Sequence, residues 1–457
     1  VYALNIRIVI LVTCLMGWAY PGQAQIFKFP SPDTLSGNYF GSSVAIEGGL
    51  AVVGSSGFNS CGTNSGAAFV YERRTDATWA LSAVLQPSDC QEDRFFGKTV
   101  SVSGGRIVVT SFRSSFNLRE SNGVYIFERD PLEGGKEHGG EGHLSEENSS
   151  EENSGTKAAS GSAKLELPTD SLKSNLIDST NVHKNNDLSS LIGRGWSQKA
   201  RISDPDRGEY GTFASAVSLY KDRIVITAAG SANGSASRGA GYIFDRQEKG
   251  NWTLTNRLTA ESHRFNGVFG TSCDLDGNRL AISSSAYASG KPGRVTIYDL
   301  DPNSNQWRVT DTIEGILAFF MPMDLSGDRL LIGESKAGKS QSGRARLFNF
   351  DGAKWKVSNT FNPTLPYNEG GFGTTVSLSG DYALIVGFEE QLELSFNVDR
   401  VVYVFHQTNG SWRQRSILDV GNPFFGSDLS FSGNTALIGQ SSGGTPGQVY
   451  AIQFNRP

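Results

Sequence analysis

The stretch FGSSVAIEGGLAVVG, residues 40–54, decides the fold because the chain repeats its pattern. It opens on a Phe-Gly pair, reaches the apolar residue Ile46 six positions later, and passes through a tight polar turn into the apolar run Leu50–Val53. Short apolar runs separated by Gly-rich turns are typical of β-strands. We therefore expect each copy of the stretch to form two antiparallel strands joined by a hairpin.

The pattern recurs with a phenylalanine at the start of each copy. The copies open at Phe40-Gly41, Phe96-Gly97, Phe213-Ala214, Phe269-Gly270, Phe319-Phe320, Phe372-Gly373 and Phe425-Gly426. A third strand with an aromatic pattern, such as Phe69-Val70-Tyr71, follows the hairpin. A fourth strand begins at a tryptophan in six copies: Trp79, Trp196, Trp252, Trp307, Trp355 and Trp412. Four short strands in each repeat unit are typical of propeller blades, so the sequence predicts an all-β fold, a seven-bladed β-propeller of four-stranded antiparallel blades over residues 25–457.

The two ends of the chain are expected to close the ring. The last unit stops after its third strand, Val449–Phe454, while Gln25–Phe29 stands at the distance of a fourth strand before Phe40. The N-terminal strand should therefore complete the last blade, which removes an exposed sheet edge.

The N-terminus and one internal segment fall outside the repeats. Arg7 and the apolar run Ile8–Leu15 precede small residues at 22–24, so residues 1–24 are interpreted as a secretory signal peptide. A membrane anchor is the alternative, although the run is shorter than the roughly 20 residues that span a bilayer. A lipoprotein signal ending at Cys14 is a weaker one. Residues 131–192, rich in Glu, Ser and Asn, are expected to form a disordered acidic insertion within blade two.

The repeat units resemble FG-GAP repeats, the blades of the integrin-α-type propeller, and in particular those of secreted bacterial-type proteins. The Phe-Gly opening is kept in five of the seven units, whereas the Gly-Ala-Pro element is replaced, for example by Gly54-Ser55-Ser56. The resemblance implies a non-enzymatic recognition or adhesion module, monomeric and either secreted or at the cell surface, with the periplasm left open. It implies an extracellular protein or glycan as partner.

Charge and motif content exclude several other functions. Lys plus Arg is 41 against 46 for Asp plus Glu, a net charge of −5 that argues against a nucleic-acid partner. No nucleophile elbow, P-loop or zinc spacing occurs, so no catalytic residue is assigned. Integrin-type blades often carry a calcium loop, but its closest imitation, Asp274-Leu275-Asp276-Gly277, lacks a late acidic ligand. We expect no cofactor or metal, and calcium at this turn is the alternative.

Carboxylates at one recurring position are candidates for a ligand site. Asp33, Asp89 and Asp206 each stand four residues past the apolar marker of a fourth strand. They are either turn-capping residues or an acidic rim that holds a cation or basic ligand. A rim of this kind leaves open a second function, a secreted carboxylate-dependent hydrolase or lyase acting on polysaccharide.

Strand alternation places the long, variable loops on one face of the propeller. Loops between second and third strands and the connections between blades share that face, where binding residues on a scaffold usually lie. Arg119 and Tyr287 in these loops are ligand-binding candidates. Cys61 and Cys90 lie in two neighbouring segments of the same face and are expected to form a disulfide. Cys273 stands at a strand position held by valine in other units, so we expect a buried free thiol.

Overall fold

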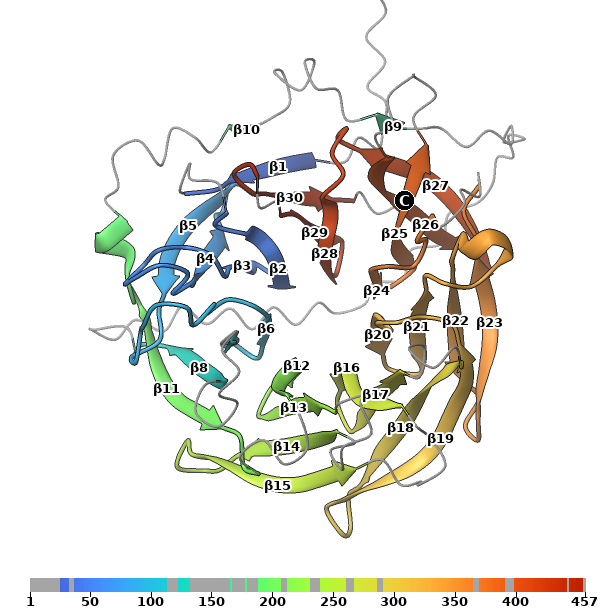
Figure 1. Ribbon diagram of the computed structural model, residues 1–457, viewed down its shortest axis with the longest axis horizontal. Coiled ribbons are helices and arrows are strands. Elements are labelled where there is room, and N and C mark those ends of the chain that lie inside the picture. The colour runs from blue at the N-terminus through green and yellow to red at the C-terminus, as the bar shows by residue number, and fades with distance from the viewer. Residues whose placement is uncertain are drawn as a thin grey trace, which may run out of the picture.

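The computed structural model describes residues 25–32, 37–112, 122–131, 165–166, 177–178, 188–206, 212–230, 239–259, 267–285, 291–364, 370–390, 398–441 and 444–454. These residues form seven sheets of four antiparallel strands arranged around a central axis (Figure 1). The predicted seven-bladed β-propeller is confirmed. The expected signal peptide, residues 1–24, lies outside the described residues.

The strands follow the chain from the axis outward in every blade. Blades one to three consist of β2 (Phe40–Glu47), β3 (Leu50–Ser55), β4 (Ala67–Arg73) and β5 (Trp79–Leu85); β6 (Val100–Ser103), β7 (Arg106–Ser111), β8 (Gly123–Arg129) and β11 (Trp196–Ser203); and β12 (Thr212–Tyr220), β13 (Arg223–Ala229), β14 (Ala240–Arg246) and β15 (Trp252–Thr259). Blades four to six consist of β16 (Val268–Asp276), β17 (Arg279–Ser285), β18 (Gly293–Asp301) and β19 (Gln306–Ile316); β20 (Met323–Ser326), β21 (Arg329–Glu334), β22 (Arg344–Phe350) and β23 (Trp355–Phe361); and β24 (Val376–Ser379), β25 (Tyr382–Glu390), β26 (Val398–Thr408) and β27 (Ser411–Asp419).

Blade seven joins the two ends of the chain. It consists of β28 (Phe425–Ser432), β29 (Thr435–Gln440), β30 (Gln448–Gln453) and the N-terminal strand β1 (Gln25–Pro30). β1 pairs antiparallel with β30, with Phe29 opposite Val449, and Figure 1 shows the two strands side by side. The predicted closure by the N-terminal strand is therefore confirmed.

Aromatic side chains fill the space within and between the blades. The opening phenylalanines of six units are at most 2% exposed: Phe40, Phe96, Phe213, Phe269, Phe372 and Phe425. Several pack edge-on against a tyrosine of their own third strand, as Phe96 does on Tyr125 at 5.4 Å between ring centroids. Flat blades of this kind bury both faces only against their neighbours, and Phe96 and Tyr125 share one core cluster with Val52 and Leu85 of blade one.

Blade five departs from the prediction. Phe319 and Phe320 do not open a strand in its core, because their side chains are 47% and 67% exposed and β20 begins only at Met323. Ala318 and Met321, which flank them, are fully buried instead. The Met321 side chain fills the space beside Gly293, so the core is complete without either phenylalanine.

The end of the expected insertion is ordered. The insertion joins β8 to β11 of blade two as predicted, since these strands pair directly. The 3₁₀ helix η2 (Leu188–Leu191) follows, and Leu191 is buried against blade one. An apolar side chain near the end of the expected insertion thus enters the core of blade one, and the expected bounds of the insertion stay a prediction. Two further pairs of residues, β9 (Leu165–Glu166) and β10 (Ile177–Asp178), run parallel to β27 and β1, and the rest of the segment lies outside the described residues.

We call the side of the ring that carries the starts of the innermost strands the loop face. The loops between second and third strands and the connections between blades lie there, including the short 3₁₀ element η4 (Lys339–Gln341). The opposite side, which carries the tight turns between first and second strands, is the turn face. On the loop face, Cys61 and Cys90 form a disulfide, the pairing expected from the sequence. Cys273 is a buried free thiol, as predicted.

Candidate functional site

A channel of about 590 Å³ runs along the propeller axis. All seven innermost strands line it, because alternate side chains of each strand point away from the blade core and toward the axis. Nearly half of the residues that line it carry small hydroxyl-bearing or acidic side chains. Five carboxylates are among the lining residues: Glu47, Asp274, Asp276, Asp324 and Asp428. No lysine or arginine lines the channel in the part of the chain that the structure describes, so its wall is acidic.

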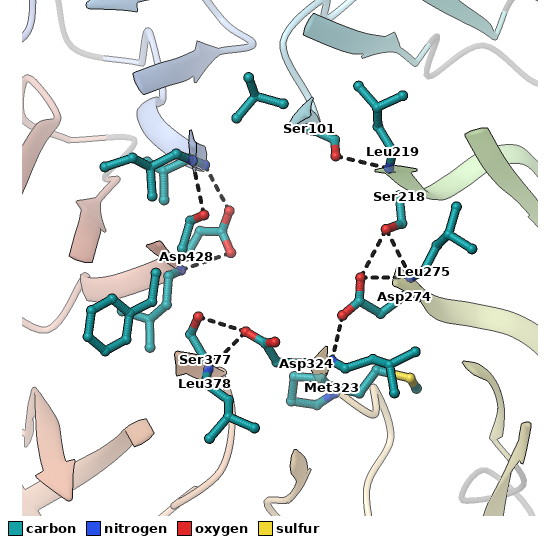
Figure 2. A pocket seen from close by; sticks show the side chains of 18 of the residues that line it. Ser101, Ser218, Leu219, Asp274, Leu275, Met323, Asp324, Ser377, Leu378 and Asp428 are labelled. Carbon is teal, nitrogen blue, oxygen red and sulfur yellow. Dashed lines mark hydrogen bonds between the residues drawn. The ribbon is translucent and has the colours of Figure 1, made fainter. Parts of the chain in front are cut away.

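At five of the seven seams, the residue just before an apolar marker accepts a hydrogen bond from the next blade. The Leu325 N–H of blade five donates to Asp274 Oδ2 of blade four at 2.7 Å, and the Leu378 N–H of blade six donates to Asp324 Oδ2 at 2.9 Å. Serine hydroxyls accept in the same way at three other seams: Ser430 from Ile46 N–H, Ser101 from Leu219 N–H, and Ser218 from Leu275 N–H. A ring of side-chain acceptors therefore ties the innermost strands together (Figure 2).

Asp428 makes a related contact where the ring closes. Its Oδ2 accepts the Val44 N–H of blade one at 2.8 Å, and its Oδ1 accepts the Leu429 N–H at 3.0 Å. Blades seven and one are far apart in the sequence, so this carboxylate secures the seam between the first and last repeats. Figure 2 shows Asp428, Asp274 and Asp324 around the same opening.

The channel makes these carboxylates hard to ionise. Loss of solvation raises the pKa of Asp428 to about 7, despite the backbone N–H groups that favour the charged form. Desolvation and then the neighbouring Asp274 raise the pKa of Asp324 to about 7, and desolvation also raises the pKa of Asp274. A carboxylate enclosed by protein loses more hydration than a few hydrogen bonds restore.

Stability should accordingly increase as the pH falls from 8.5 to 5.5. The folded-state pKa of Asp324 and Asp428 lies above the unfolded value, so the folded chain holds more protons in this window and gains stability toward acid. We expect a rise of roughly 1–2 kcal/mol in the free energy of unfolding for each group, since channel water still solvates part of each carboxylate. Urea unfolding at several pH values measures this. Asp428→Asn should flatten the dependence, whereas the exposed control Glu248→Gln should not, and a stability maximum near pH 8 would contradict the assignment.

The rim carboxylates predicted from the sequence take part in contacts between strands. Asp89 forms an ion pair with Arg201 at 3.2 Å, and the same arginine Nε donates to the Tyr125 hydroxyl. Asp206 accepts a hydrogen bond from the Tyr242 hydroxyl at 2.7 Å and pairs with Arg257. Both aspartates thus lie in a blade-to-blade connection and contact a Tyr–Arg pair of the next blade. The third candidate of this set, Asp33, lies outside the described residues, as do Arg119 and Tyr287.

Exposed aromatic side chains gather on the loop face. Among the described residues, four aromatic side chains are exposed, and each stands shortly before the innermost strand of a blade: Tyr39, Phe319, Phe320 and Phe424. Four exposed aliphatic side chains lie elsewhere: Leu254, Val309 and Val357 on outermost strands, and Ile192 shortly before the outermost strand β11. Tyr39 also has a φ of 53°, a region that bulky residues rarely adopt and that is strained. The backbone is therefore strained at Tyr39, one of the four residues that present an exposed aromatic side chain on the loop face.

The described residues give no direct sign of a metal or membrane function. They contain no group of three or more His, Cys, Asp or Glu side chains arranged to hold a metal ion. No helix in the described ranges is long and apolar enough to cross a membrane. The expectation that no cofactor is bound stays a prediction.

The FG-GAP repeat family model matches residues 24–71 and 196–244. Each match begins at an outermost strand, β1 or β11, and ends within the third strand of the following blade, β4 or β14. The sequence repeat is thus displaced by one strand from the structural blade, which explains why the fourth strand of the last blade comes from the N-terminus.

Comparison with curated proteins gives no match. Among solved structures, an acylaminoacyl peptidase from Pyrococcus horikoshii, in an orthorhombic crystal form, is similar at a TM-score of 0.45 and 9% identity. The alignment covers 91% of this chain and 52% of that chain, so this chain spans about half of that length. No function follows from a likeness at this level. The seven repeated blades and the two family matches support an FG-GAP repeat β-propeller.

Proposed function

We propose that the chain is a secreted or cell-surface recognition module that binds an extracellular protein or glycan through its loop face. The observation that carries the proposal is that the exposed aromatic side chains all lie on that face, while the exposed aliphatic ones lie on or just before outermost strands. Aromatic residues are enriched at binding surfaces because they bury a large area at a low cost in conformational entropy. An FG-GAP propeller supports a binding role of this kind.

A location outside the cytoplasm is part of the proposal. The Cys61–Cys90 disulfide favours an oxidising compartment, since such bonds are rare in reducing ones. The apolar run that begins at Ile8 is consistent with export, as the sequence predicts.

The second candidate function is a carboxylate-dependent hydrolase or lyase. Its catalytic groups would be rim aspartates such as Asp89 and Asp206, and both are held in ion pairs with arginines. A catalytic carboxylate needs access to substrate, so these contacts favour the binding function. Assays on polysaccharides and esters, with Asp89→Ala and Asp206→Ala as variants, separate the two. Turnover that disappears in either variant without loss of folding would favour the enzyme.

Arg119→Ala and Tyr287→Ala test the binding function directly. We expect each to weaken binding of the physiological partner, recovered from the native secretion, while lowering the free energy of unfolding by no more than about 0.5 kcal/mol, as is usual for surface positions. Titration of the partner against wild type and variants, beside a urea unfolding curve, measures both quantities. Asn251→Ala, an exposed change on the turn face, is the control. If Asn251→Ala abolishes binding of the partner while Arg119→Ala and Tyr287→Ala leave it unchanged, the assignment of binding to the loop face is wrong.

A further inference from the structure

The segment between blades four and five presents two phenylalanines on a fixed support. The rings of Phe319 and Phe320 lie 4.9 Å apart and are 47% and 67% exposed. The residues on either side, Ala318 and Met321, are fully buried. Exposing an apolar ring to water is unfavourable. Because Ala318 and Met321 occupy the core on either side, neither phenylalanine ring can pack into it. A patch of this kind marks a contact surface.

Backbone contacts hold the segment rigid from the side of blade five. The Lys336 N–H donates to the Leu317 carbonyl at 3.0 Å, and the Gly333 N–H donates to the Pro322 carbonyl at 2.9 Å. Arg346 Nη2 donates to the Gly315 carbonyl at 3.4 Å. A rigid surface loses little conformational entropy when a partner binds, so more of the contact energy appears as affinity.

Basic residues lie in the segments that contact this one. Lys336 is in backbone contact with the segment, and Lys291 stands two residues before Gly293, which packs on Met321. No acidic side chain lies within ion-pair distance of either lysine among the residues that the structure describes. Arg344 and Arg346 share the single carboxylate of Glu334, which is fully buried, so this cluster also keeps a net positive charge.

We infer that Phe319 and Phe320, with Lys291, Lys336, Arg344 and Arg346 around them, form a docking surface for an acidic protein segment that carries apolar side chains. This inference rests on the proposed function and names the part of the loop face and the class of partner. The aromatic pair supplies an apolar centre and the basic side chains a charged rim, which is the anatomy of protein interfaces. Complementary charge then selects the partner.

Two other occupants fit the surface less well. An anionic bilayer laid on this face would also meet the exposed residues Glu92 and Asp93 in the connection between blades one and two. Those carboxylates would oppose it electrostatically. A polysaccharide needs many hydrogen-bonding partners, and the centre of the patch is two phenylalanine rings that have none.

Fluorescence anisotropy with the full chain tests the inference. The probe is a labelled peptide in which two leucines are flanked on both sides by glutamates. We expect it to bind, and we expect Phe320→Ser and Lys336→Glu each to weaken binding about tenfold or more. The matched controls, Val357→Ser on an outer strand and Lys354→Glu on the turn face, should leave binding unchanged, because both are exposed residues elsewhere in blade five.

Competing probes decide between the occupants. The same peptide with lysines in place of glutamates, vesicles containing phosphatidylglycerol, and alginate should all fail to bind. Binding of vesicles or alginate in place of the acidic peptide, or no effect of Phe320→Ser, overturns the inference, as does failure of the acidic peptide to bind wild type. Loss of peptide binding in Tyr39→Ser alone would overturn the inference and leave the proposed function intact. Loss in Lys354→Glu alone would contradict both.

Discussion

Truncation of the chain to begin at Asp33 should lower the free energy of unfolding by several kcal/mol. The deletion removes β1, and with it Phe27 and Phe29, which are 4% and 1% exposed. The Phe29 ring stacks on Tyr71 of blade one at 4.4 Å, so it joins the core between the last and first blades. Truncating one buried phenylalanine typically costs about 3–5 kcal/mol. The deletion also leaves the outer edge of β30 unpaired and open to aggregation.

Point variants separate packing from strand pairing. Phe29→Ala keeps the β1 backbone and should cost about 3 kcal/mol or more by itself. Gln25→Ala, at the exposed first position of the same strand, should change stability by less than about 0.5 kcal/mol. Urea unfolding followed by tryptophan fluorescence is a suitable measurement, because Trp79 contacts the Phe29 ring. A truncated chain as stable as the full one would refute the role of β1 in closing the ring.

The apolar repeat was predictable from the sequence because its spacing is regular. The phenylalanine, the apolar marker six residues later and the tryptophan keep their places in nearly every unit, and each lies at a fixed position in a blade. Blade five shows the limit of this reasoning. Phe319 has the expected spacing to Leu325, yet spacing cannot show that the Met321 side chain occupies the core there.

The polar contacts between blades were missed, although the sequence contains their signal. Ala45 stands before the first apolar marker, and the residues directly before the other six are all polar: Ser101, Ser218, Asp274, Asp324, Ser377 and Ser430. Their small polar side chains recur as regularly as the markers, and in the structure they line the channel. A search restricted to apolar periodicity passes over them. Only the three-dimensional ring shows that all six polar residues accept a hydrogen bond from the neighbouring blade or donate one to it.

Arginines at the start of second strands form another repeated contact that sequence reasoning missed. Arg106, Arg223 and Arg279 pair with an acidic residue of the third strand in their own blade, for example Arg279 with Asp299 at 2.7 Å. Arg279 also reaches Asp328 in the first turn of the next blade at 2.6 Å. In four units the sequence has an arginine immediately before the apolar run. Its acidic partners lie in other strands, so the spacing within one stretch of sequence does not predict these ion pairs. The loop-face sites were less predictable still, because they depend on side chains from several blades.

Replacing Cys61 and Cys90 by alanine should lower the free energy of unfolding by about 3 kcal/mol. The disulfide closes a loop with a sequence separation of 29 residues, and a cross-link of this length removes that much conformational entropy from the unfolded chain in the usual model. The disulfide joins the loop between β3 and β4 to the connection between β5 and β6, so both cysteines lie on the loop face. Both segments also contact each other through backbone bonds, such as Asp93 N–H to the Thr63 carbonyl at 2.8 Å.

Cys273→Val is the matched control for the disulfide variant. Cys273 is a buried free thiol at the strand position that Val44, Val100, Val217 and Val376 hold in other blades, so valine should fit at a cost below about 1.5 kcal/mol. Differential scanning calorimetry of the oxidised wild type, the double alanine variant and Cys273→Val measures the three stabilities. Treatment of wild type with a reductant should reproduce the double variant and leave that variant unchanged. Because the loss arises mainly in the unfolded chain, the double variant should still adopt the native fold and retain loop-face binding at a temperature well below its transition. Equal stability of wild type and double variant, or alkylation of Cys61 in the native oxidised protein, would show that the bond does not form in solution.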